Sequence, residues 1–155
     1  MFDLIISIAI TLLGFLAMEA IAWFSHKYIM HGILWTLHKD HHTPSKEHVF
    51  QKNDFFFLLF ASPGIACLAY GLAYDSFLFW IGLGITLYGF TYFLVHDIII
   101  HRRIKGFNTP EWPYVKAIRK AHKIHHKQTE KHHGSCFGML VVPRKYYVEA
   151  HRISK

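Results

Sequence analysis

The chain has 155 residues, of which 52% are hydrophobic and 17% charged, and its formal net charge is +7. This length allows one compact unit, and no Gly/Ser/Pro-rich stretch divides it, so we predict a single domain over residues 1–155. A basic balance of this size is also typical of nucleic-acid-binding proteins, but the distribution of the charges described below argues against that class.

The first predicted element is an apolar helix over residues 2–24, which carries only two charges, Asp3 and Glu19. About twenty helical residues span the hydrocarbon core of a bilayer, so this stretch is long enough to cross it. No Lys or Arg precedes the apolar run, which favours a retained anchor over a cleaved signal peptide. Glu19 lies seven residues before His26, on nearly the same helix face, and we expect it to accept a hydrogen bond from a ligand imidazole or from other buried polar groups.

Histidines follow in the pattern His-x4-His and then His-x2-His-His: they are His26, His31, His38, His41 and His42. On a helix, the three histidines of His-x2-His-His share one face, so their imidazoles project into the same space. The spacing in His-x4-His instead puts two rings about 140° apart around a regular helix. We therefore expect such a pair to flank a site, or to bind different metals, rather than to chelate one metal together.

Two further apolar stretches, residues 55–74 and 76–95, carry no charge and are again long enough to cross a membrane. They lack the polar stripe that a helix of a soluble protein shows. With the first stretch they predict an all-α integral membrane protein with about three transmembrane helices. Tyr88 and Tyr92 lie before the next histidine set and are candidates to line a substrate path, although plain helix packing explains them better.

The histidine pattern repeats after the third span, and its second copy is His96, His101, His122, His125 and His126. Pro110 and Pro113 mark a loop between the two parts of this copy, with a helix expected from about Tyr114. Asp97 follows His96 and Asp40 precedes His41. Each aspartate is a candidate to orient an imidazole, but neighbours in sequence point apart, so a solvated role fits equally well.

The basic residues predict the orientation. All seventeen Lys and Arg lie in two regions, four in residues 27–52 and thirteen in residues 102–155. Two predicted spans separate these regions, so both lie on one side, which the positive-inside rule assigns to the cytoplasm. The N-terminus is then outside and both histidine sets face the cytoplasm. Basic residues beside spans also attract anionic lipid headgroups, so membrane lipid is expected as a partner and nucleic acid is not.

Ten imidazoles are more than one metal ion can use, so we predict a site for two metal ions in a helical cap on the cytoplasmic face. A shell of imidazoles without thiolate or carboxylate suits zinc, copper or iron. A structural zinc site needs only four ligands, so a dinuclear iron centre that activates dioxygen fits better, with zinc able to replace iron. The remaining histidines fall outside the pattern and are expected to be solvated: His48, His132, His133 and His151.

The residues around the histidines are distinctive as well. They form the stretches 18–20, 26–32, 35, 37–42, 53–54, 88–89, 92–93, 95–97, 121–126 and 137–140. In these stretches the chain resembles the bacterial-type β-carotene hydroxylases of the fatty acid hydroxylase superfamily. The resemblance implies a membrane non-haem di-iron monooxygenase that hydroxylates carbon 3 of β-ionone rings, taking β-carotene through β-cryptoxanthin to zeaxanthin. It also implies that all ten pattern histidines are metal ligands.

The same resemblance implies dioxygen as co-substrate, a carotenoid taken from the bilayer of the bacterial inner membrane, and electrons from a ferredoxin with its NAD(P)H-linked reductase. The chain has no nucleotide-binding glycine motif and no cysteine set for an iron–sulfur cluster, which agrees with an external donor. Candidate groove residues are the aromatics Trp23, Phe24, Trp35 and Phe93, although aromatics at membrane interfaces are often belt anchors.

Three alternatives stay open. One is another histidine-motif lipid hydroxylase or desaturase, and a second is a carotenoid ring oxygenase that acts at carbon 4. A metal transporter or a haem-binding electron carrier is less well supported, because the histidines cluster on one predicted face and the spans hold almost no ligands.

Overall fold

The computed structural model describes residues 3–43, 50–104, 106, 111–127, 131 and 135–153, and in these residues the regular elements are all helical. The helices are α1 Leu4–Phe24, η1 Ser25–Ile33, α2 Trp35–His42, η2 Lys52–Asp54, α3 Phe55–Ala73, α4 Leu78–Tyr92, η3 Phe93–Ile100, α5 Pro113–His126 and α6 Arg144–Ile153. The all-α prediction is confirmed.

Three continuous helices are long and apolar enough to cross a membrane: Leu4–Ile33, Lys52–Ala73 and Leu78–Ile100. The predicted spans 2–24, 55–74 and 76–95 fall on them. The first and third helices extend past their predicted ends because α1 runs on into η1 and α4 into η3, so the chain stays helical through His31 in the first set and up to Ile100, directly before His101, in the second. Large apolar side chains such as Leu13 and Leu58 are more than 60% exposed, as expected for helix faces in contact with lipid.

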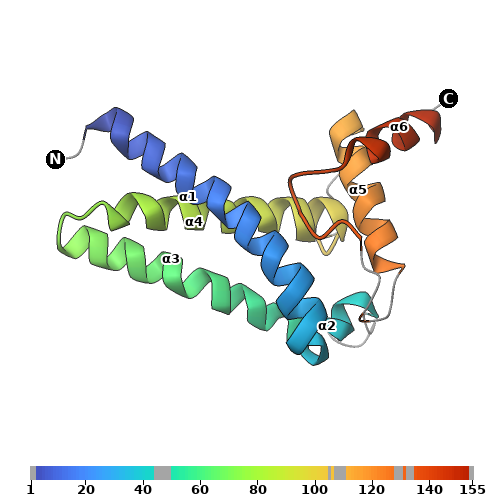
Figure 1. Ribbon diagram of the computed structural model, residues 1–155, viewed down its shortest axis with the longest axis horizontal. Helices are drawn as coiled ribbons and strands as arrows, with labels where there is room; N and C mark the ends of the chain where they lie inside the picture. Colours follow the sequence, from blue (N-terminus) through green and yellow to red (C-terminus); the bar gives the residue numbers. More distant parts are fainter. Residues whose placement is uncertain are drawn as a thin grey trace.

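The three long helices pack closely through small residues. The α3 and α4 helices form an antiparallel hairpin, and α1 crosses α4 (Figure 1). A Cβ atom on Gly84 of α4 would lie 2.4 Å from the carbonyl oxygen of Thr11 in α1, and one on Gly71 of α3 would lie 2.1 Å from the backbone nitrogen of Phe79 in α4. Small residues of this kind let membrane helices approach one another.

This packing brings both histidine sets to one end of the molecule. The N-terminus and the turn between α3 and α4 lie at the opposite end, whereas α2, α5 and α6 gather where α1 and α4 finish (Figure 1). The α5 helix begins at Pro113, a residue suited to the first turn of a helix. It packs on α6 through a buried cluster of Ala117, Ala121 and Tyr146.

Candidate metal centre

Both His-x4-His pairs are spaced by π-helices: His26 and His31 lie in η1, whereas η3 contains His96 and ends at Ile100, directly before His101. In η3 the backbone N–H of His101 donates to the carbonyl of His96, five residues back, at 2.9 Å. Five-residue hydrogen bonding places residues i and i+5 on one side of the helix, so the rings of His96 and His101 are 4.5 Å apart and those of His26 and His31 are 5.2 Å apart. The expectation that each pair would be splayed around a regular helix is therefore wrong, since π-helical winding replaces regular winding at these two places.

The ligand atoms of nine pattern histidines form two groups, within each of which every ligand atom lies within 4.8 Å of the others. The first group is His26, His31, His38, His42 and His125. The second group is His41, His96, His101 and His122. The tenth histidine, His126, adjoins the second group, because its Nε2 lies 2.8 Å from that of His122. All ten predicted residues are thus brought together, although the sequence could not assign them to groups.

The middle histidine of each His-x2-His-His triplet belongs to the opposite group from its neighbours. His41 joins the second group while His38 and His42 stay in the first, and His125 joins the first group while His122 stays in the second. The two groups are consequently contiguous: the rings of His42 and His126 stack 4.7 Å apart. The three histidines of a triplet therefore share one space only if the two contiguous groups are counted as one centre.

Several imidazoles point Nε2 into a group and Nδ1 at an oxygen acceptor. The Nδ1 atoms of His26 and His125 lie 3.0 and 2.8 Å from the carbonyl oxygens of Phe137 and Ser135. Those of three others face side-chain oxygens: His38 with Asn53 at 2.6 Å, His41 with Gln51 at 3.1 Å and His96 with Asp97 at 3.4 Å. A backbone carbonyl can only accept, so the proton sits on Nδ1 and the Nε2 lone pair points inward.

The inward nitrogens fit a metal ion. The Nε2 atoms of His26 and His38 are 3.1 Å apart, and His42 Nε2 is 3.2 Å from those of His31 and His38. Two bare lone pairs at this distance repel unless a cation lies between them. Around a metal with bonds of about 2.0–2.1 Å to nitrogen, neighbouring ligand atoms of an octahedron or tetrahedron are about 2.8–3.4 Å apart. The donor set is all imidazole nitrogen, which suits iron, copper or zinc.

Four pattern histidines outside the spanning helices, His38, His41, His101 and His125, are neutral near pH 7 because their pKa values are lowered. Burial, reinforced by repulsion from neighbouring imidazoles, lowers the pKa of His38 to about 3 and that of His101 to about 2. The same causes lower the pKa of His125 to about 2 and hold that of His41 well below its usual value. Because neutral imidazole is the form that binds a metal, the site is poised for metal binding without first losing protons.

Oxygen acceptors hold five of the imidazoles, and sequence reasoning missed most of these acceptors. Gln51 was not considered at all, and Asn53 was noticed only as part of a family resemblance. Asp97 does orient the adjacent imidazole of His96, so the expectation that sequence neighbours point apart was wrong at that site. Asp40 has a different role among the described contacts: its carboxylate accepts from the backbone N–H groups of Lys52 and Asn53, and so it holds the segment that carries the two missed residues.

Glu19 supports the centre through a loop. Its Oε1 accepts the backbone N–H groups of Met139, Leu140 and Val141 at 3.0, 2.9 and 3.1 Å, and its Oε2 accepts the hydroxyl of Tyr88 at 2.7 Å. Of the two roles predicted for Glu19, the structure shows the one toward buried polar groups. The loop it holds is the one that offers the carbonyl of Phe137 to the first group.

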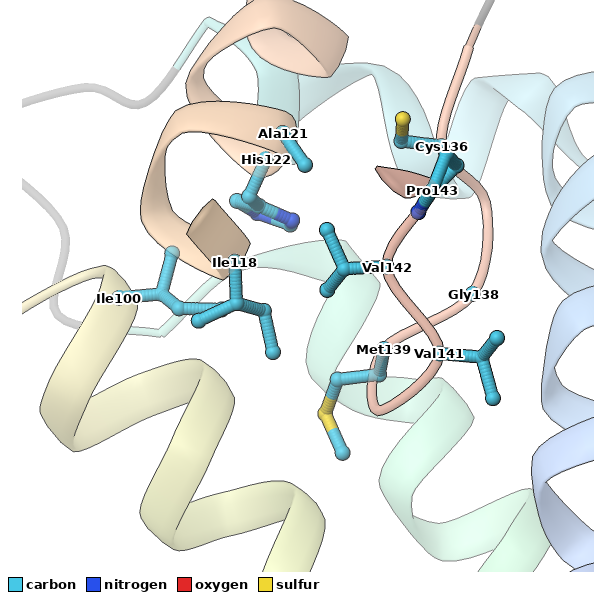
Figure 2. A pocket seen from close by; sticks show the side chains of 10 residues that line it. All are labelled: Ile100, Ile118, Ala121, His122, Cys136, Gly138, Met139, Val141, Val142 and Pro143. Atoms are coloured by element: carbon cyan, nitrogen blue, oxygen red, sulfur yellow. The ribbon is translucent and has the colours of Figure 1, made fainter. Parts of the chain in front are cut away.

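The other side of this loop packs on α5. Figure 2 shows Ile118 and His122 of α5 facing Met139 and Val142 of the loop. The gap between them is only about 10 Å³, barely the space that one water molecule needs. The loop is therefore held between α5 and the Glu19 carboxylate of α1.

A larger cavity of about 560 Å³ lies among α1, α3 and α4 and reaches His26 of the first group and His96 and His122 of the second. Its walls are mainly apolar and include Tyr88 and Tyr92, the residues considered for a substrate path. Of the four predicted groove aromatics, Phe93 lines it. Trp23 and Phe24 are exposed and pack on Tyr28, and Trp35 packs on the rings of the first group.

The structure does not test the expectation for the histidines outside the pattern. His48, His132 and His133 lie outside the described residues, and so does the side chain of His151 in α6. Their expected solvated role stays a prediction.

The fold has three helices of membrane-spanning length, and at one end they carry two buried histidine groups that could hold metal ions. These features define the class of helical membrane proteins with a metal-compatible centre. Comparison with known proteins narrows this class. The chain belongs to the fatty acid hydroxylase family, whose family model matches residues 11–142.

Curated relatives are β-carotene hydroxylases. That of Pseudescherichia vulneris is 42% identical over 137 residues, which are 88% of this chain and 77% of the relative. That of Pantoea ananas is 40% identical over 134 residues, 86% of this chain and 74% of the relative. The chloroplastic β-carotene 3-hydroxylase 1 of Arabidopsis thaliana is 35% identical over 132 residues, 83% of this chain and 42% of the relative. No solved structure matches the chain.

Proposed function

We propose that the chain is a membrane oxygenase that hydroxylates carbon 3 of the β-ionone rings of carotenoids, taking β-carotene through β-cryptoxanthin to zeaxanthin. One observation carries the proposal: in a chain that is similar to β-carotene hydroxylases over most of its length, a mainly apolar cavity among the spanning helices ends on both histidine groups. A ring that enters from the bilayer would there meet the metal centre in a site that excludes water.

The ten pattern histidines would hold two iron ions, one in each group. When bound, the two irons would activate dioxygen so that one of its oxygen atoms can be inserted into an unactivated C–H bond, and the other would leave as water after two electrons are taken up. The chain's own part is to hold the Nε2 lone pairs inward, through acceptors on Nδ1, and to keep the imidazoles neutral. Electrons would come from an external donor of the ferredoxin type.

The orientation is also a proposal: the N-terminus outside and the histidine groups on the cytoplasmic face of a bacterial inner membrane. The support is the charge distribution, since thirteen of the seventeen basic residues follow the third spanning helix. A reporter enzyme that works only in the cytoplasm, fused after Lys155, should be active. An inactive reporter there, together with activity of a second reporter that works only after export and is fused at the same place, would reverse the assignment.

Expression in a β-carotene-producing bacterium, followed by pigment chromatography, tests the activity. Hydroxylation at carbon 3 should give β-cryptoxanthin and zeaxanthin, each identified against a standard. Ketone products at carbon 4 would favour the alternative carotenoid ring oxygenase. Unchanged β-carotene in the presence of a competent electron donor would contradict the carotenoid substrate and leave a different lipid hydroxylase as the better assignment.

Leucine in place of Gly89 is expected to block the cavity while leaving the histidine groups intact. Gly89 lines the cavity, and a Cβ atom there would meet nothing within 4 Å. The added side chain should therefore occupy the space of the ring and lower hydroxylation about tenfold or more, equivalent to about 1.4 kcal/mol. Ala66→Leu, which places the same side chain on the exposed face of α3, is the matched control. Full activity of Gly89→Leu with normal metal content would show that the ring binds elsewhere.

A further inference from the structure

Arg103 follows η3 and contacts three side-chain acceptors, one in η3 itself and two in the distant segment 51–54. Its Nε lies 3.0 Å from Asp97 Oδ1, one terminal nitrogen lies 3.2 Å from Asp54 Oδ1, and the other lies 3.0 Å from Gln51 Oε1. The side chain is about one-third exposed, at 32%. The planar guanidinium, with five donors in a fixed fork, suits this kind of multiple contact, which a lysine could not reproduce.

Two of these three acceptors also hold imidazoles of the second group. Gln51 Oε1 lies 3.1 Å from Nδ1 of His41, and the other oxygen of Asp97 lies 3.4 Å from Nδ1 of His96. The rings of His41 and His96 stack 5.0 Å apart. Arg103 is thus one residue removed from two imidazoles that face the same metal position.

A side-chain amide has two ends, and this gives Arg103 a specific task. If the Gln51 amide turned over, its NH₂ would face Nδ1 of His41, which would then have to accept. The proton of that imidazole would move to Nε2, where it would occupy the lone pair needed by the metal. Arg103 can only donate, so it keeps Gln51 Oε1 at the place where both Arg103 and the N–H of His41 reach it.

We propose that Arg103 is a positioning residue for the second histidine group: through Gln51 and Asp97 it sets the orientation and tautomer of His41 and His96, and so the affinity for one of the two metal ions. The inference rests on the proposed dinuclear function. It predicts that a change at Arg103 affects only the metal ion of the second group, because the imidazoles of the first group have other hydrogen-bond acceptors. Among the described contacts these are Asn53 and the carbonyls of Phe137 and Ser135, none of which Arg103 touches.

The test is a Co²⁺ titration of the metal-stripped full-length protein in detergent, followed by visible absorption of the bound ion. The unsubstituted protein should take up two equivalents. His31→Ala and His101→Ala mark the spectral contributions of the first and second groups. Arg103→Gln should lower the affinity for the Co²⁺ ion whose absorption is missing in His101→Ala by about 10- to 100-fold. The affinity for the other Co²⁺ ion should stay unchanged. Arg144→Gln, an exposed arginine at the start of α6, is the matched control and should change neither.

A second pair of variants separates positioning from general damage. Gln51→Leu removes the acceptor of His41 and leaves the contacts of Arg103 with both carboxylates intact. It should therefore lower the affinity for the same Co²⁺ ion, that of the second group. Gln51→Glu offers oxygen at both ends, so adding it to Arg103→Gln should restore part of the lost affinity. Loss of both ions in Arg103→Gln with no recovery in the double variant, or an unchanged second contribution, would overturn the role of Arg103. Fewer than two equivalents in the unsubstituted protein would instead contradict the dinuclear proposal, and the assignment of Arg103 with it.

Discussion

Replacing His41 by alanine is expected to abolish hydroxylation and to release the same metal ion as His101→Ala, not the ion released by His38→Ala. His41 stands next to His42 in the chain, but its ligand atom lies with those of His96, His101 and His122. Loss of residues that merely orient a ligand typically costs 10- to 100-fold in activity or metal affinity, so loss of the ligand should exceed about 100-fold. The measurement is pigment conversion together with metal content per chain.

Spectra of the Co²⁺-loaded variants show which ion is lost. The His41→Ala and His101→Ala variants should share one residual spectrum, and the His38→Ala and His42→Ala variants the other. His151→Ala removes a histidine outside the pattern and should leave activity and metal content unchanged. A residual spectrum of His41→Ala that matches His38→Ala would contradict the crossing of His41 to the second group.

The spans and their common end were predictable because they depend on length and composition alone. A chargeless run such as residues 55–74 needs no tertiary contact to specify a long apolar helix. Two such spans between the histidine sets then place both sets at one end, whatever the details of packing. The gathering of all ten histidines in one place followed from that arrangement, and the structure brings them together.

The assignment of histidines to groups was not predictable, because it depends on local winding and on distant partners. The spacing of His26 and His31 indicates separate faces only on a regular helix, and nothing in these residues signals the π-helical turn that brings them together. The acceptor for His26 comes from Phe137, 111 residues further along the chain. A backbone carbonyl carries no residue-type signal, so no pattern in the sequence could identify it.

Leucine in place of Glu19 is expected to destabilise the protein and to release the ion of the first group. The Glu19 carboxylate accepts three backbone N–H groups of the loop at Met139, Leu140 and Val141, and leucine would leave them without this acceptor. An unpaired buried donor costs about 1–3 kcal/mol, and part of this loop is exposed, so the total should be on the order of 3 kcal/mol. Thermal unfolding in detergent and metal content per chain measure the two effects.

Glu19→Gln separates hydrogen-bond geometry from charge. A glutamine oxygen can accept the same three N–H groups while its NH₂ faces the oxygen of Tyr88, so this variant should keep the loop and most of the metal. Tyr88→Phe, which removes only the contact to Oε2, should do the same. Glu19→Leu with normal metal content would show that the loop holds its place without the carboxylate.

Glu19→Leu should release only the ion of the first group, because the loop supplies acceptors to histidines of that group. The carbonyls of Ser135 and Phe137 orient His125 and His26, which both belong to the first group. Loosening of the loop should therefore release the ion that His31→Ala releases and spare the one that depends on Arg103. Support for the two ions would then come from opposite sides: a carboxylate inside a spanning helix for the first, and a guanidinium beyond the end of another for the second. An equal loss of both ions in Glu19→Leu would instead mean that the loop supports the centre as a whole.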